Sequence, residues 1–132
     1  MRDVNVRPLA ETGLAAHIEA GPHVLRSDEP FSIGGTDSGA TPQELLLAAL
    51  GACTSITLRM YATRKNWPLR EARLTLTAST VDGVYVIRRQ LVLEGDLDDA
   101  QRDRLEEIAN RCPVHRAITG EVRVVDFDGG LA

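Results

Sequence analysis

The sequence is poor in lysine, in cysteine and in aromatic residues, and it carries no excess of positive charge. Lysine occurs once, at Lys65, among 15 basic residues, and the formal net charge is −4. A nucleic acid or an anionic membrane requires a basic surface, so neither is expected as a partner. The N-terminus lacks a signal-peptide pattern, since Arg2 and Arg7 interrupt it. We therefore expect a cytoplasmic protein whose two cysteines stay reduced.

Two further patterns are missing. The glycine-rich stretch at residues 34–39 lacks both the Walker lysine and the G-x-G-x-x-G spacing, which weakens a phosphate-binding interpretation. We interpret it instead as a flexible connector to the next helix. In addition, no apolar run reaches the roughly 18–20 residues that a membrane-spanning helix needs.

The feature that dominates what is present is a helix predicted from Thr41 to about Arg64. Thr41 suits the N-cap, Pro42 the first helical position, and Glu44 lies at the spacing of a capping box. From Leu45 to Cys53 the helix is apolar on nearly every side. Such a helix is fully buried, and one sheet of a small chain cannot cover it. A second subunit is therefore expected to cover the rest.

The remaining elements predict an α+β fold in a single domain, residues 1–132. Three strands precede the long helix, and a hairpin turning at Asp82-Gly83 follows it. A helix capped by Asp98 should run to about Arg111, and a last strand is expected from Glu121 to Phe127. Grouped strands favour antiparallel sheets. The stripe of that second helix is Leu105, Ile108, Ala109 and Cys112.

Two cysteines are the residues that could carry chemistry. Cys53 lies inside the long helix, and Cys112 precedes Pro113. One interpretation makes both thiols small core residues. The other makes them a redox pair, which needs an activated thiolate and a route for the sulfurs to meet. A cation would have to come from elsewhere, because Cys53 is about eleven residues inside its helix and beyond reach of the N-terminal dipole.

A metal site is disfavoured. Cys112 and His115 would supply two ligands, and Cys53, His17 and His23 would have to converge on them. The sequence contains no second closely spaced pair, and we expect neither a metal nor another cofactor.

Several motifs together carry a resemblance to a known family. They are Asp28-Glu29-Pro30, Gly34-Gly35-Thr36-Asp37, Thr41-Pro42-Gln43-Glu44-Leu45-Leu46, Leu50-Gly51-Ala52-Cys53-Thr54, Met60-Tyr61-Ala62, Lys65-Asn66-Trp67-Pro68-Leu69 and Arg111-Cys112-Pro113-Val114-His115-Arg116. In these motifs the chain resembles the OsmC/Ohr family, and its OsmC-like branch more than Ohr proper. The resemblance extends from about Leu14 to Val125.

This resemblance implies an OsmC-like fold in an intertwined homodimer, with a long central buried helix and exchanged strands. It also implies a thiol-dependent hydroperoxide reductase. By motif position Cys53 attacks the peroxide and Cys112 resolves the product to a disulfide, which an external dithiol reduces. Apolar walls would favour organic hydroperoxides as the small-molecule substrate.

Two departures from the family pattern concern the residues around the thiol. The family places a glutamate directly after the motif proline, where this chain has Gln43; Glu44 follows one position late and is explained more simply by capping. Gln43 lies about 15 Å along the helix from Cys53. The family also carries an activating arginine in an early strand, for which Arg26 and then Arg7 are the candidates.

His115 and Arg116 offer a further source of positive charge near Cys112. The alternative to a peroxidase is a non-catalytic ligand-binding or stress-associated module that keeps the fold, and Gln43 is the residue that keeps this alternative open.

Overall fold

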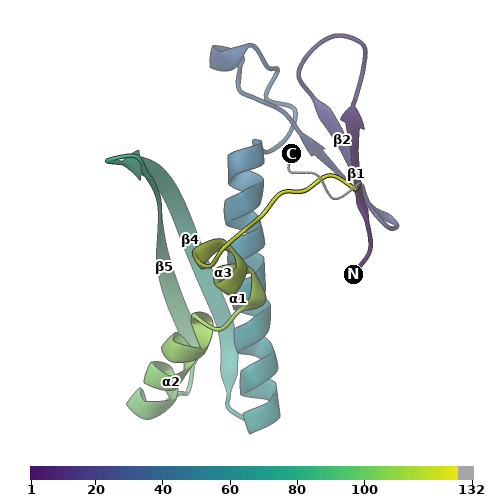
Figure 1. Ribbon diagram of the computed structural model, residues 1–132. Coiled ribbons are helices and arrows are strands. Elements are labelled where there is room, and N and C mark those ends of the chain that lie inside the picture. The colour runs from purple at the N-terminus through teal and green to yellow at the C-terminus, as the bar shows by residue number, and fades with distance from the viewer. Residues whose placement is uncertain (128–132) are drawn as a thin grey trace. The chain divides into compact units, whose positions relative to one another are not determined.

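The computed structural model describes residues 1–127 and shows an α+β chain with antiparallel sheets, as the sequence predicts (Figure 1). The described chain separates into two compact units, Met1–Leu46 and the residues from Leu47 onward. Whether the two units fold as one domain stays a prediction.

The first unit contains an antiparallel sheet of three short strands in the order β1-β2-β3. Their bounds are Val4–Pro8, Ala16–Ala20 and His23–Ser27. Gly21 has a positive φ of 60° at the tight turn between β2 and β3, a conformation that glycine adopts without strain. Val4, Val6 and Val24 are all more than 60% exposed. The sheet therefore lacks a core of its own within this unit.

The long helix α1 spans Pro42–Lys65 and begins as predicted. The Thr41 hydroxyl accepts from the Glu44 amide at 3.1 Å, and the Glu44 carboxylate accepts from the Thr41 amide at 3.4 Å, which completes a capping box. Asn66, in the left-handed region with φ 55°, ends the helix.

Burial along α1 follows a single stripe of residues four apart: Leu50, Thr54, Leu58 and Ala62. Leu46 and Ile56 are 40% and 59% exposed. Within the single chain the second unit buries only one face of α1, and burial of the other faces by a second subunit stays a prediction. By length and composition alone α1 also suffices to cross a membrane, although a packed stripe is equally what a core helix of a soluble protein shows.

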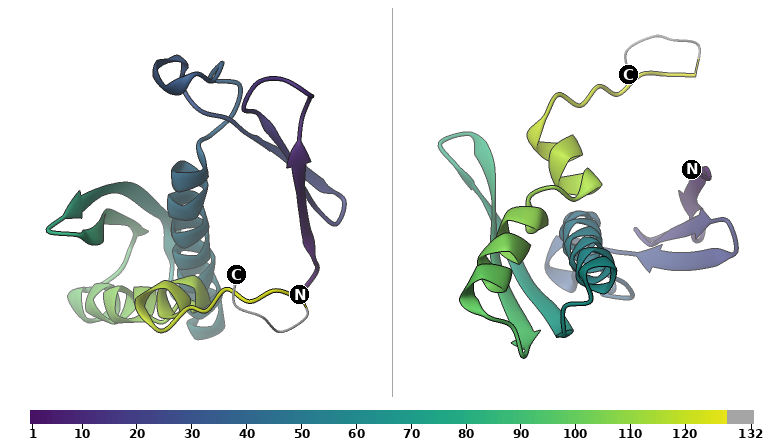
Figure 2. Two further views of the ribbon diagram at one scale, coloured as in Figure 1. Left: turned by 45° about the horizontal axis from the view of Figure 1, so that its top comes forward. Right: turned by 90° about the horizontal axis from the view of Figure 1, so that it is seen from below.

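The second unit packs a hairpin and two helices against α1. Strands β4 (Leu69–Val81) and β5 (Val84–Gly95) pair antiparallel and turn at Asp82-Gly83, where both residues have positive φ. Seen nearly along α1, the hairpin and α2 (Asp99–Ala109) lie to one side of it (Figure 2). Their core contains Leu58, Ala62, Leu69, Leu97, Leu105, Ile108 and Ala109.

The chain around Cys112 differs from the prediction. Asp98 and Gln101 form the expected capping box, but α2 ends at Ala109 instead of Arg111. Cys112 is the N-cap of a further helix, α3 (Pro113–Thr119), which the sequence analysis missed. The physical reason is proline: it suits the first turn of a helix, and it pushes the residue before it into the extended region that an N-cap adopts. Pro113 therefore starts a helix rather than stopping one.

The last strand, predicted for Glu121–Phe127, is wrong within the described residues, where only Val125 forms an isolated bridge. A strand needs hydrogen-bonded neighbours along its length, and within the described residues this segment has only the single bridge at Val125. Val122, Val124 and Phe127 are left exposed.

Candidate functional site

Cys112 is fully buried, and its sulfur has two polar neighbours. As the N-cap of α3 it accepts a hydrogen bond from the backbone N–H of His115 at 3.2 Å. Its second neighbour is the Thr54 hydroxyl, 3.6 Å away. Thr54 also donates to the carbonyl of Leu50 at 2.8 Å, so its oxygen can accept from the Cys112 S–H. Sequence reasoning predicted burial of this thiol but not Thr54 as its neighbour.

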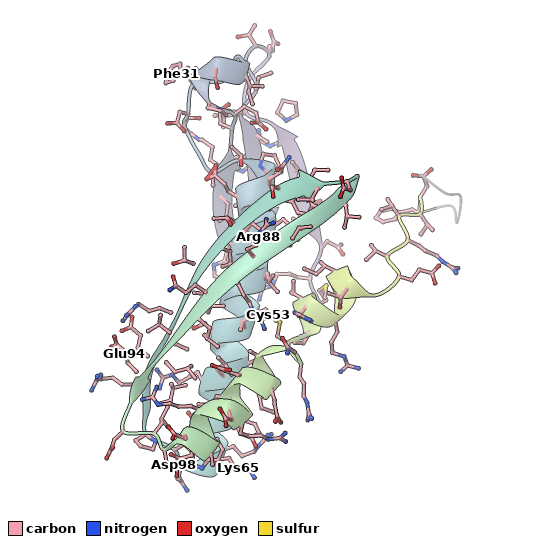
Figure 3. All side chains as sticks on the ribbon, turned by 90° about the vertical axis from the view of Figure 1, so that its left-hand side faces the viewer. Phe31, Cys53, Lys65, Arg88, Glu94 and Asp98 are labelled. Carbon is pink, nitrogen blue, oxygen red and sulfur yellow. The ribbon has the colours of Figure 1, made fainter. Side chains whose placement is uncertain are left out.

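Cys53 directly precedes Thr54 on α1 and is only partly buried. Figure 3 shows it near the middle of the helix, at the level where the chain passes from α2 to α3. Successive helical residues point about 100° apart, so the Cys53 side chain leaves α1 roughly a quarter turn from the face that Cys112 contacts. Both predicted cysteines lie in the second unit as free thiols, and Cys112 contacts Thr54, the residue that follows Cys53.

Arg89 on β5 is the basic residue tied to the segment before Cys112. Its side chain is partly buried, and its Nη2 donates to the Asn110 side chain, two residues before Cys112. Its other terminal nitrogen, Nη1, is buried and has no hydrogen-bond partner among the described residues. An unpaired buried donor is uncommon in folded proteins. No sequence motif pointed to Arg89.

In the first unit, the glycine-rich segment is organised by the Asp28 carboxylate, which is 2% exposed. Asp28 accepts hydrogen bonds from the amide and hydroxyl of Ser38, at 3.1 and 2.7 Å, and from the amide and hydroxyl of Thr36, at 3.2 and 2.9 Å. The Glu29 amide donates as well, at 2.8 Å. These bonds, that from the Ser38 hydroxyl first, hold the pKa of the Asp28 carboxyl well below its usual range.

The interpretation of residues 34–39 as a flexible connector therefore missed a hydrogen-bonded loop. The loop already holds an anion of its own, the Asp28 carboxylate, where the weak phosphate-binding interpretation had placed an external one. Gly35 is the position that permits this arrangement, because a Cβ there would collide with the backbone of Glu29.

Gln43 and Glu44 occupy the first turn of α1 and have different surroundings. Glu44 is engaged in the capping box, as predicted. Gln43 is exposed and lines a hollow of about 220 Å³ together with Glu29, Pro30, Ile33 and Thr41. Its own helix separates it from Cys53 by about 15 Å.

The two candidate activating arginines lie on the outer strands of the first sheet. Arg7 on β1 and Arg26 on β3 both face His17 of β2 in the strand register, and both are exposed. His17 bonds to Glu19 at 2.8 Å. A catalytic role for Arg26 or for Gln43 stays a prediction.

The two remaining candidates near Cys112, His115 and Arg116, differ in whether they contact its sulfur. His115 is partly buried and supplies the N–H bond to the sulfur, whereas Arg116 is exposed on α3. Within residues 1–127, no three His, Cys, Asp or Glu side chains lie close enough together to hold a metal ion.

Comparison with known proteins gives a family match over most of the chain. A family model described as "OsmC-like protein" matches residues 35–125. Among curated proteins, none matches the sequence.

Solved structures share the fold. An OsmC-like protein from Mycoplasma pneumoniae superposes with a TM-score of 0.75 at 19% identity, covering 91% of this chain and 88% of that one. The organic hydroperoxide resistance protein OhrB of Bacillus subtilis gives 0.60 at 26% identity, over 92% and 93%. An organic hydroperoxide resistance protein OsmC from Legionella pneumophila gives 0.63 at 22% identity, over 89% and 90%.

Proposed function

Because this chain belongs to the OsmC-like protein family, we propose that it is a thiol-dependent hydroperoxide reductase in which Cys53 attacks and Cys112 resolves. The observation that carries the proposal is the unequal exposure of two neighbouring thiols. Cys53 is partly open to solvent, and Cys112 is buried against Thr54. A peroxide can reach the first sulfur and not the second, which fits attack at Cys53 and resolution from within.

The reaction balances with one peroxide and one dithiol per turnover. The Cys53 thiolate attacks the O–O bond; an S–O bond forms, and the released alkoxide takes a proton and leaves as an alcohol. The Cys112 sulfur then attacks the Cys53 sulfenic acid, an S–S bond forms and water leaves. An external dithiol reduces this disulfide and restores both thiols.

Formation of the disulfide requires the two Cα atoms to come within about 7 Å. The short segment between α2 and α3, which is neither helix nor strand, supports such a movement. Cys112 lies at the end of that segment, as the N-cap of α3, so a movement of the segment would move its sulfur relative to Cys53.

A homodimer belongs to the same proposal. Apolar side chains stand exposed on the β1-β2-β3 sheet and on α1, among them Val4, Val6, Val24 and Ile56. A soluble chain rarely leaves so much apolar surface uncovered, and a second copy would cover it. Sedimentation of the purified protein should give twice the chain mass of 14.4 kDa; a stable monomer would contradict the dimer. We also propose a cytoplasmic location, which is the expectation from the sequence.

The test of the reductase is a thiol titration after adding an equimolar amount of cumene hydroperoxide. The parent should lose both free thiols and form an intrachain disulfide, seen by mass spectrometry after alkylation. Cys112→Ser should stop at a sulfenic acid that dimedone traps, and Cys53→Ser should keep its remaining thiol.

Other outcomes would favour a different function. If the parent keeps both thiols and Cys53→Ser behaves identically, the chain is a non-catalytic module that uses the fold for binding. If Cys112→Ser still consumes peroxide over many turnovers with a dithiol present, Cys112 is not needed to resolve the intermediate.

A further inference from the structure

A second cavity lies in the second unit, beside the segment that carries Cys112, and it is strongly basic. We call it the basic cleft. It has a volume of about 540 Å³ and is lined by residues of α1, of α2 and of the segment from α2 into α3: Thr57, Met60, Tyr61, Arg64, Lys65, Arg104, Ile108, Arg111 and Pro113. Neither cysteine is among them. This volume falls within the range of small-molecule sites in proteins.

The cleft is positively charged, whereas the chain as a whole is negatively charged. Four of its lining residues are cationic and none is acidic, although the chain as a whole has a net charge of −4. The only lysine of the sequence, Lys65, is one of the four; Figure 3 shows it at the end of α1. Like charges gathered in one concavity repel each other, and a bound anion relieves that repulsion.

Tyr61 is the residue around which three of the cations gather. The guanidinium carbon of Arg64 lies 5.3 Å from the ring centroid, and Lys65 Nζ and the Arg104 guanidinium carbon each lie 5.8 Å from it. The Arg104 Nε–H donates to the Tyr61 hydroxyl at 3.1 Å. That hydrogen bond, with the charges of Arg104, Lys65 and Arg64, lowers the pKa of the tyrosine hydroxyl.

Most of these cations are not neutralised by the protein. Arg104 pairs with Glu107 at 2.8 Å. Among residues 1–127, Arg64, Lys65 and Arg111 have no acidic partner within ion-pair distance. Guanidinium groups suit carboxylate and phosphate oxygens because they donate in a planar fork. Met60, Ile108 and Pro113 add an apolar surface beside these charges.

We propose that the basic cleft binds a small amphiphilic anion, with its phosphate or carboxylate group at Arg64, Lys65 and Arg111 and its apolar part against Met60 and Ile108. Neither cysteine lines the cleft, so binding of the anion should not require a thiol, although Arg111 and Pro113 flank Cys112 in the sequence. A phosphate and a carboxylate would be recognised by the same guanidinium donors. The experiment below distinguishes these two head groups.

The experiment is calorimetric titration of the purified protein with hexyl phosphate and, separately, with hexanoate. Inorganic phosphate and hexanol serve as head-only and tail-only probes. We expect at least one of the two amphiphiles to bind about tenfold or more tightly than inorganic phosphate, and hexanol not to bind. The amphiphile that binds more tightly identifies the head group.

Variants locate the site. Arg64→Gln and Arg111→Gln keep much of the side chain and remove the charge, and each should weaken binding about tenfold. Arg88→Gln is the matched control, because Arg88 is exposed on β5 and bonds to Ser79 outside the cleft. Cys53→Ser should bind like the parent, so a failed peroxidase assay and a failed binding assay remain distinguishable.

Three outcomes would overturn the proposal. The first is no binding of either amphiphile up to about 10 mM. The second is an equal loss of binding in Arg88→Gln. The third is that Arg64→Gln changes the sedimenting mass while no anion binds to the parent, which would show that a second copy of the chain fills the cleft.

Discussion

Two buried groups, the Asp28 carboxylate and the Cys112 sulfur, show how differently the two units treat a reactive atom. Asp28 is 2% exposed and accepts five hydrogen bonds from three residues. Cys112 is 0% exposed, accepts one backbone hydrogen bond and has one hydroxyl beside it. Both cap a short stretch of backbone, but only the carboxylate has its acceptor capacity filled.

The difference separates structure from chemistry. A carboxylate surrounded by donors is held in its charged form and cannot move without breaking several bonds at once. A sulfur with one accepted hydrogen bond breaks fewer bonds when it moves. We therefore assign Asp28 to the stability of its loop and leave the chemistry to the thiols, and the following predictions test that division.

Asp28→Ala should produce the largest effect on stability and none on the thiols. It leaves the amides of Glu29, Thr36 and Ser38, whose hydrogen bonds to Asp28 are partly buried, without their acceptor, and each lost hydrogen bond lowers stability. We expect the urea midpoint to fall by roughly 1–2 M, measured by circular dichroism. Asp28→Asn, which keeps one carbonyl oxygen, should lose less. A parent-like midpoint for Asp28→Ala would contradict the structural role.

The same carboxylate should make stability depend on pH. Its pKa in the folded protein lies below the unfolded value of about 3.9, so its contribution is fully present above that pH and is lost as the pH falls toward the folded pKa. Urea midpoints of the parent and of Asp28→Asn should therefore differ most near about pH 7 and converge below about pH 4. A difference that stays constant down to pH 3, about one unit below the unfolded pKa, would exclude the charge as the cause.

Two arginines allow the same comparison within the second unit. Arg102 donates to the carbonyls of Leu93, Gly95 and Leu97, at 2.7, 3.0 and 3.3 Å, whereas Arg89 leaves a buried nitrogen unpaired. Arg102→Met should lower the free energy of unfolding by about 2 kcal/mol, and Arg89→Met by less than about 1 kcal/mol. Urea unfolding followed by Trp67 fluorescence measures both. Equal losses would show that the number of hydrogen bonds does not determine how much each arginine contributes to the free energy of unfolding.

What the sequence could predict is local. The capping boxes at Thr41 and Asp98, the Asp82-Gly83 turn and the buried stripe of α2 all depend on residues within a few positions of each other. The network around Asp28 joins residues eight and ten positions apart through loop geometry, which no periodic pattern encodes. The basic cleft needs α2 to pack against α1, which brings together residues some forty positions apart in the sequence. Only tertiary packing could reveal either one.

Thr54→Val tests the surroundings of the Cys112 sulfur, the group with fewer hydrogen bonds in this comparison. It should have the smallest effect on stability. Valine has nearly the shape of threonine but lacks the hydroxyl that lies between Leu50 and Cys112. The free energy of unfolding should fall by about 1 kcal/mol. Disulfide formation should slow roughly fivefold, because Cys112 loses the hydroxyl contact that helps to fix the position of its sulfur. Oxidation of Cys53, the earlier step, should keep its rate.

Ser55→Ala is the matched control for this variant. Ser55 follows Thr54 on α1 and donates to the carbonyl of Ala72 at 3.2 Å, without contacting either cysteine. It should lose a comparable amount of stability while disulfide formation, followed by stopped-flow fluorescence after a peroxide pulse, stays at the parent rate. If both variants slow that step equally, a general loosening of α1 explains the result. A slowing confined to Thr54→Val would mean that this single hydroxyl positions the buried sulfur for its reaction.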